Sequence, residues 1–60
     1  MHTYDEAIKE LRLMQERLRA IREKTCDPKS NENPRYLGLS TAVSGITKAI
    51  ENMLVEARSR

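Results

Sequence analysis

The chain has 60 residues, 33% of them charged, and a net charge of +2. It contains one cysteine and one histidine, which excludes an intrachain disulfide and a zinc cluster of His and Cys ligands. No apolar run approaches the roughly 20 residues that span a bilayer, and His2, Asp5 and Glu6 are unlike the start of a secretory signal. A single unpaired thiol suits a reducing compartment, so we expect one small cytoplasmic domain.

Residues 4–25 are predicted to form a first helix. Thr3 and Glu6 have the T-x-x-E spacing of a capping box, which satisfies backbone N–H groups at a helix start. Pro28 disfavours a helical Asp27, so this helix should end near residue 25. Its apolar stripe repeats in steps of three and four residues, the period of helices that pack lengthwise. The stripe is Tyr4, Ala7, Leu11, Met14, Leu18, Ile21 and Thr25.

Residues 26–33 are rich in turn formers and are predicted to be a loop before a second helix at about residues 34–58. Asn33 can cap a helix that has Pro34 as its first residue. Alternatively Ser40 is the cap and Gly38 belongs to the loop. A second heptad stripe favours the earlier start because it reaches back to the beginning of this segment. That stripe is Tyr36, Leu39, Val43, Ile46, Ile50, Met53 and Ala57.

Two such helices form an antiparallel hairpin that has little core of its own, since a 60-residue domain buries only about 60% of its unfolded surface. Ile8, Leu13, Leu37 and Leu54 widen the apolar faces beyond the two stripes, which indicates more than one neighbour per helix. We therefore expect an all-α protein in which hairpins assemble into a homo-oligomeric helix bundle.

A run of small residues lies beside the second stripe: Gly38, Ala42, Gly45, Ala49 and Asn52. Small side chains let another backbone or a flat ligand approach a helix closely. Two interpretations stay open. The run is either a close helix crossing inside the oligomer or the floor of a shallow pocket between subunits.

Groups that bind phosphates and bases lie next to that run. Arg35 and Lys48 would supply charge, and Tyr36 or Tyr4 would stack on a base. Hydroxyl groups would donate hydrogen bonds, although serines and threonines near a helix start are more often caps. The candidate ligand-binding residues are Arg35, Tyr36, Ser40, Thr41, Lys48 and Tyr4.

Charge is distributed unevenly along the first helix. Residues 3–16 carry a net charge of −2, whereas residues 17–24 are mainly basic through Arg17, Arg19, Arg22 and Lys24. This polarity complements the helix dipole. It also favours antiparallel pairing of first helices between subunits.

No residue pattern indicates catalysis. Cys26 lies at a helix end beside Asp27 and has no histidine base to activate it. A P-loop, a nucleophile elbow and a G-x-G-x-x-G motif are all missing from the sequence. We expect a protein that is not an enzyme and has no catalytic residue, no metal and no cofactor.

Residues 44–51, with the sequence SGITKAIE, resemble the second helix of small phage hairpin proteins that sequester nucleotide signals of bacterial immunity, the anti-CBASS and anti-Thoeris sponges. The shared feature is Ile46-Thr47-Lys48 followed by an apolar residue and Glu51, whereas the aromatic residue that follows in that pattern is missing here. The resemblance implies an oligomer that binds cyclic nucleotides between subunits without cleaving them.

The leading interpretation is a phage or mobile-element accessory protein that sequesters an anionic, nucleotide-type ligand at the interfaces of a homo-oligomer. One alternative is an inhibitor or adaptor that presents a helical face to a larger host protein. In that case Leu13, Leu37 or Leu54 should stay uncovered. Another is an RNA-binding four-helix bundle, which predicts steep salt dependence and reliance on Arg19 and Arg22. No membrane partner is expected.

Overall fold

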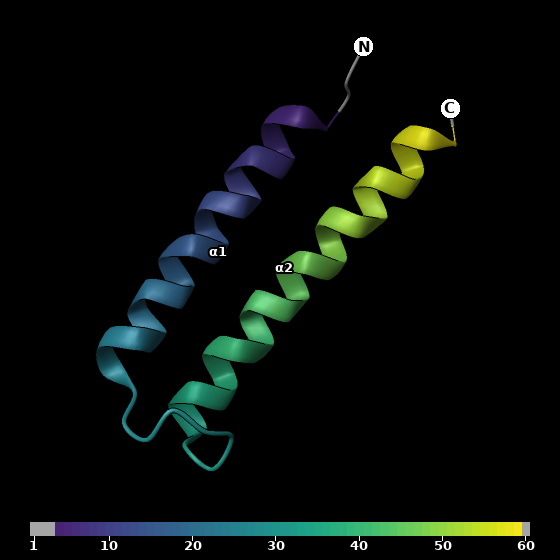
Figure 1. The fold of residues 1–60 in the computed structure, drawn as a ribbon. Helices are drawn as coiled ribbons and strands as arrows, with labels where there is room; N and C mark the ends of the chain where they lie inside the picture. The colour runs from purple at the N-terminus through teal and green to yellow at the C-terminus, as the bar shows by residue number, and fades with distance from the viewer. Residues whose placement is uncertain (1–3, 60) are drawn as a thin grey trace.

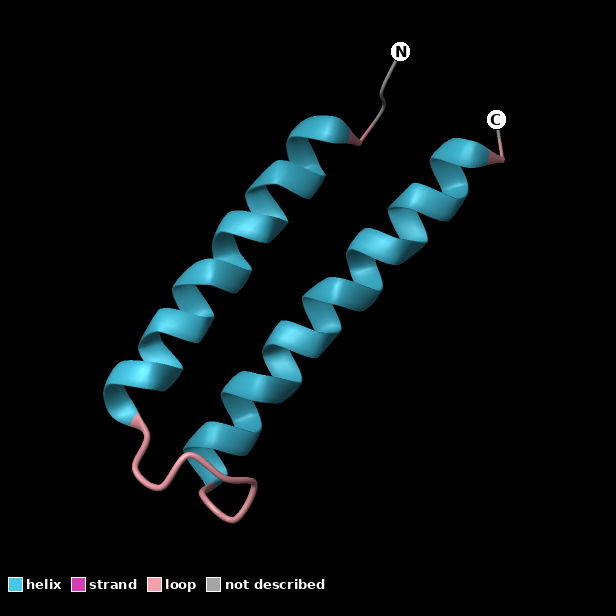
Figure 2. Cartoon of the chain, in the orientation of Figure 1, coloured by secondary structure: helices cyan, strands magenta, loops and turns pink. Residues whose placement is uncertain are grey.

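The computed structural model describes residues 4–59 and shows two antiparallel helices that lie side by side along their length (Figure 1). Helix α1 spans Asp5–Thr25 and helix α2 spans Pro34–Arg58. The loop between them closes one end of the hairpin, and the start of α1 and the end of α2 lie at the other, open end (Figure 2). The predicted helical hairpin is confirmed.

Helix α1 begins and ends where local chemistry favours it. Tyr4 is its N-cap and makes no capping bond with its side chain, while Thr3 of the predicted capping box lies outside the described residues. Two acidic residues in the first turn complement the helix dipole. At the other end Cys26 is extended, with φ −105° and ψ 126°, so α1 ends at Thr25, three residues before Pro28.

Side chains in and next to the loop form hydrogen bonds with backbone groups at the end of α1 and the start of α2. Helix α2 has the earlier of the two possible starts: Pro34 is its first residue, and the Asn33 side-chain oxygen accepts a hydrogen bond of 3.1 Å from the Arg35 backbone N–H. The amide group of Asn33 donates to the Pro28 carbonyl at 3.1 Å. The Arg35 guanidinium donates to the Thr25 carbonyl at 2.7 Å and so caps the last turn of α1.

The hairpin is a single layer of helices. Its Cα atoms extend over 44 × 16 × 9 Å, and its radius of gyration of 13.9 Å exceeds the value of about 10 Å for a compact chain of this length. The buried apolar residues among positions 4–59 are Cys26, Val43 and Ile50. The core is therefore a narrow line between the two helices.

The face that α1 turns toward α2 differs from its apolar stripe by one residue. Gln15 is buried and Arg22 is half-buried at this contact, whereas Met14 and Ile21 are 48% and 47% exposed. One residue corresponds to a rotation of 100° about the helix axis. Met14 and Ile21, two members of the predicted stripe, therefore lie to one side of the contact between α1 and α2.

This rotation gives the hairpin two unlike sides, because the same-handed flanks of two antiparallel helices fall on one side of the pair. We call one side the apolar flank, formed by Leu11, Met14, Leu18 and Ile21 of α1 and by Leu39, Ala42, Ile46, Ala49 and Met53 of α2. The opposite side is the charged flank, formed by Arg12, Glu16, Arg19 and Glu23 of α1 and by Ser40, Ser44, Thr47 and Glu51 of α2.

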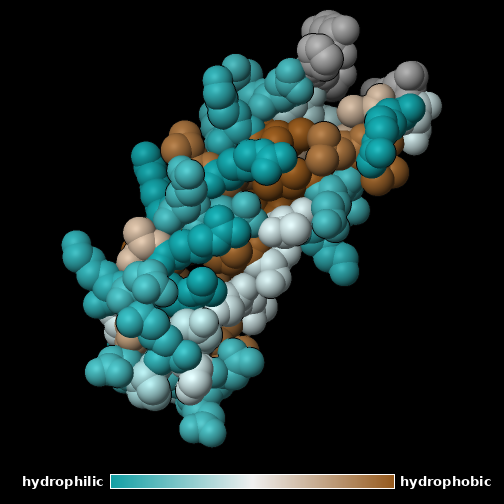
Figure 3. Space-filling model, viewed as in Figure 1, coloured by the Kyte–Doolittle hydropathy of each residue, from teal (hydrophilic) through white to brown (hydrophobic). Residues whose placement is uncertain are grey.

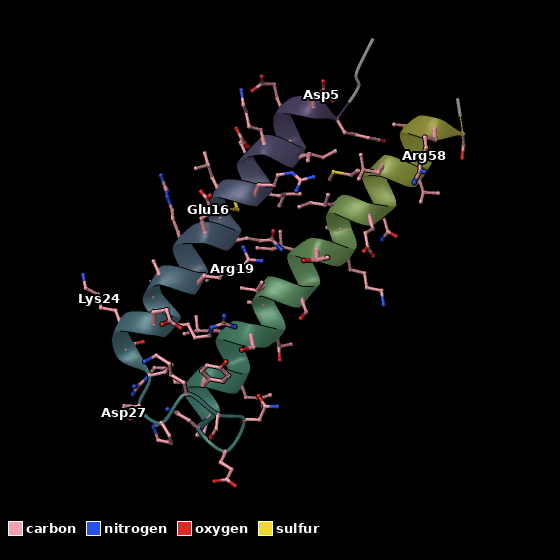
Figure 4. The ribbon with its side chains drawn as sticks, viewed as in Figure 1. Asp5, Glu16, Arg19, Lys24, Asp27 and Arg58 are labelled. Carbon is pink, nitrogen blue, oxygen red and sulfur yellow. The ribbon has the colours of Figure 1, made fainter. Side chains whose placement is uncertain are left out.

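The face seen in Figure 3 is mostly hydrophilic over α1 and around the loop, with an apolar band between the helices. Figure 4, in the same view, labels Glu16 and Arg19 of the charged flank. Within residues 4–59, neither helix combines the length and apolar character needed to cross a membrane. A cytoplasmic location stays a prediction.

Replacing Asn33 tests the loop junction. Asn33→Ala removes the oxygen that caps α2, and we expect the free energy of unfolding to fall by about 1 kcal/mol in urea titrations. Asn33→Asp keeps that oxygen and loses only the bond to the Pro28 carbonyl, so it should retain most of the stability. Equal losses in the two variants would contradict the capping role.

Candidate functional site

A buried glutamine ties the two helices together near the middle of the hairpin. Gln15 is 6% exposed. Its side-chain NH₂ group donates hydrogen bonds to the Val43 carbonyl at 2.9 Å and to the Thr47 hydroxyl at 2.6 Å. The Thr47 hydroxyl in turn donates to the same carbonyl at 3.2 Å. Since buried amide groups are costly unless bonded, these contacts hold Gln15 in one orientation.

An arginine makes a second tie one heptad nearer the loop. Arg22 Nη1 donates to the Ser40 hydroxyl oxygen at 2.8 Å, and the guanidinium carbon lies 5.0 Å from the centre of the Tyr36 ring. This distance is typical of a cation–π contact. The Arg22 Nε atom is buried without a hydrogen-bond partner. Arg22 therefore brings a guanidinium, an aromatic ring and a hydroxyl together near the loop. They lie on the line of contact between α1 and α2, which we call the seam.

The structure brings some of the predicted ligand-binding residues close together, and they make contacts within the hairpin. Tyr36 and Ser40 both contact Arg22. Arg35 caps α1 through the Thr25 carbonyl. The Thr41 hydroxyl donates to the Leu37 carbonyl of its own helix at 2.8 Å and faces solvent. Lys48 is exposed on α2, further from the loop.

Tyr4 is not part of this group. Its hydroxyl donates to a Glu56 carboxylate oxygen at 2.7 Å, at the open end of the hairpin. Glu56 lies 20 residues after Tyr36 on the same helix, which corresponds to about 30 Å at 1.5 Å per residue. The two tyrosines of one chain therefore cannot stack on the same base.

Gln15 and Arg22 are the residues that sequence reasoning missed at the centre of the seam. Gln15 had no assigned role, and Arg22 was counted with a basic patch. A signal was present: Ile8, Gln15 and Arg22 recur every seven residues, directly after the apolar positions 7, 14 and 21. A heptad position that holds polar residues with the length to cross a seam can mark the contact line itself.

The basic residues of α1 do not form one surface. Arg22 is turned toward α2, Arg19 lies on the charged flank, and Lys24 points away from α2 (Figure 4). Charge still differs between the two halves of the hairpin. The loop half, residues 17–41, has six cations and three anions and a net charge of +3. The open half, residues 4–16 and 42–59, has a net charge of −2.

One hairpin alone does not enclose a ligand. No pocket opens on the surface that residues 4–59 form. In the same part of the chain, no three His, Cys, Asp or Glu side chains are grouped as metal ligands would be. Because small ligands bind in concave sites, a ligand site on this protein would need a second chain to complete it.

Comparison with protein-family models, with curated proteins and with solved structures finds no match to this chain. The geometry of the hairpin therefore has to carry the functional argument.

The polar tie at Gln15 can be tested by making it apolar. In the double variant Gln15→Leu/Thr47→Val, the new apolar side chains join Val43 and Ile50 in one apolar contact between the helices. We expect the free energy of unfolding to rise by about 1–2 kcal/mol. Gln15→Ala leaves a cavity and removes both bonds, and should lower it by about 1–3 kcal/mol. Urea titrations at one chain concentration measure both. A less stable double variant would mean that the bonds contribute more than apolar packing.

Proposed function

We propose that this protein is a non-enzymatic binding protein that acts as a homo-oligomer of helical hairpins. The observation that carries the proposal is the apolar flank, a surface that spans both helices. Its α1 residues Met14 and Ile21 are about half exposed, and Leu11 and Leu18 are only half-buried. Contiguous apolar surface of this kind marks an interaction site.

The exposed area agrees with one missing partner surface. The hairpin exposes 4816 Å², whereas a compact protein of 6.9 kDa exposes about 4,000 Å². The difference is about 800 Å², which is the area that each partner buries in a standard protein interface. A second hairpin would bring the exposed area per chain to the normal value for its mass.

The layer structure supports the same conclusion. Domains consist of two or more packed layers around a core, and this chain supplies one layer. A second layer of helices on the apolar flank would give Leu18 and Ile46 the burial typical of residues inside a four-helix bundle. Self-association is a common way for a chain of this size to reach stability when it has no disulfide or metal.

Two neighbouring residues of equal exposure test the assembly. Met14 and Leu13 are each 48% exposed, but Leu13 points away from both α2 and the apolar flank. We expect Met14→Asp to weaken association at least tenfold because the flank would bury a charge. Leu13→Asp should leave the mass unchanged. Analytical ultracentrifugation measures both.

A monomeric wild-type chain would contradict the proposal. Dissociation by Leu13→Asp and not by Met14→Asp would place the contact on the opposite side of α1. Such a result would favour the alternative of a module that presents that side to a larger protein.

A nucleotide-type anion is the ligand class that the loop half favours. Guanidinium, aromatic and hydroxyl groups meet at Arg22, Tyr36 and Ser40, within a half of net charge +3. Lys48 adds an exposed ammonium on α2. The resemblance of residues 44–51 to phage proteins that sequester nucleotides supports the same class. Since a single hairpin has no pocket in its described part, the ligand would be held between chains.

Isothermal titration with a panel of cyclic and linear nucleotides tests ligand binding. We expect heat with at least one nucleotide and a loss of affinity of about three- to tenfold in Lys48→Ala, because a charge-assisted contact is removed. Lys9→Ala, which removes an exposed lysine of α1 outside the predicted ligand-binding residues, is the matched control and should bind normally. Absence of heat with every nucleotide would refute the nucleotide proposal.

A further inference from the structure

We propose that the apolar flank is covered by a second copy of this chain in antiparallel orientation, with the two loops at opposite ends of a four-helix bundle. In this arrangement α1 packs on the partner's α1, and α2 packs on the partner's α2. The inference rests on the proposed self-association and adds the geometry of the interface.

A two-fold axis can bring two apolar flanks face to face in two ways. If the axis runs along the helices, the two loops lie at the same end and α1 packs on the partner's α2. If the axis crosses the helices at a right angle, the loops lie at opposite ends and like helices pack on each other. Both arrangements bury the same residues, so apolar area does not distinguish them.

Charge distinguishes the two arrangements. With the loops at the same end, two halves of net charge +3 lie next to each other. With the loops at opposite ends, each +3 half lies against a half of net charge −2. Packed helices are 8–10 Å apart, which is close to the Debye length of about 8 Å at physiological ionic strength. Like charges across an interface are penalised, so the antiparallel arrangement is favoured.

Most of this charge polarity resides on α1, the helix that the antiparallel arrangement pairs with itself. Residues 4–16 have a net charge of −2 and residues 17–25 a net charge of +3. In the other arrangement the basic part of α1 would lie near the start of the partner's α2, which carries Arg35 and no acidic residue in its first turn. That pairing would place cations near cations, with no acidic residue in the first turn of α2 to compensate them.

The side chains on the flank also suit this packing. Residue 15 lies midway along α1, which runs from Asp5 to Thr25, so the two-fold axis would pass close to Met14. Each Met14 would then meet its own counterpart, and methionine adapts well to such a contact. On α2 the flank carries Ala42 and Ala49, and no atom outside the helix lies within 4 Å of the Cβ position at neighbouring Gly45. Two α2 helices can therefore approach closely.

Distances between spin labels test the orientation in the full-length chain. The sole cysteine is replaced in a Cys26→Ser background, whose mass is checked first against the wild-type protein. One label is placed in the loop by Lys29→Cys and another at the open end by Ser59→Cys, both at exposed positions. Pulsed electron spin resonance then measures label pairs within homodimers and within a mixture of the two variants.

We expect loop-to-loop distances near the 44 Å length of the hairpin, and a short distance only between Lys29→Cys and Ser59→Cys chains in the mixture. Loop-to-loop distances within roughly 20 Å, about two interhelical spacings, would overturn the antiparallel arrangement and leave self-association intact. A monomeric mass in the wild-type protein would overturn both the inference and the proposed function.

Discussion

The rotation of α1 about its own axis is the constraint on which the rest of this structure depends. Gln15 and Arg22 reach across the seam to Thr47 and Ser40, and each pair is separated from the next by seven residues on both helices. Their bonds run through the contact line between the helices. As a consequence, the large apolar residues beside them, Met14 and Ile21, lie on a flank and stay half exposed.

A seam with polar side chains gives the hairpin less stability than an apolar one, but it specifies how the two helices are aligned. An apolar seam would bury more hydrophobic surface, but polar side chains that must find particular partners specify one register and one rotation. The unpartnered Arg22 Nε and the small number of buried apolar side chains among residues 4–59 show how little the isolated hairpin gains in return. The same rotation leaves an apolar surface free to complete a core with another chain.

Several residues near the loop that are predicted to bind a ligand make contacts that stabilise the hairpin. Arg35 caps α1, Ser40 accepts a hydrogen bond from Arg22, and Tyr36 packs under that guanidinium. Groups suited to phosphate and base recognition are thus gathered at one end of the hairpin by contacts that stabilise the fold. Lys48 and Arg35 are both exposed cations among the predicted ligand-binding residues, and Lys48 lies on α2 away from the apolar flank.

The two helices, the loop and the all-α fold class follow from local features of the sequence. Heptad stripes, the Asn33-Pro34 start of α2 and the break before Pro28 act locally, within a few residues, so they could be deduced from the order of side chains. The charge asymmetry along the first helix is also visible in the order of its residues, whereas the net charges of the two halves of the hairpin arise only when the antiparallel fold brings residues 4–16 beside residues 42–59.

The face of α1 that meets α2 depends instead on contacts between residues far apart in the chain. The spacing of the apolar residues indicates a stripe about 100° wide. A rotation of the helix by one residue, which is also about 100°, changes little in the helix's own hydrogen bonds. The choice depends on whether Gln15 and Arg22 find partners, and Thr47 and Ser40 stand 32 and 18 residues away in the chain. The separation of Tyr4 from Tyr36 has the same origin, because the antiparallel fold places the starts of the two helices at opposite ends.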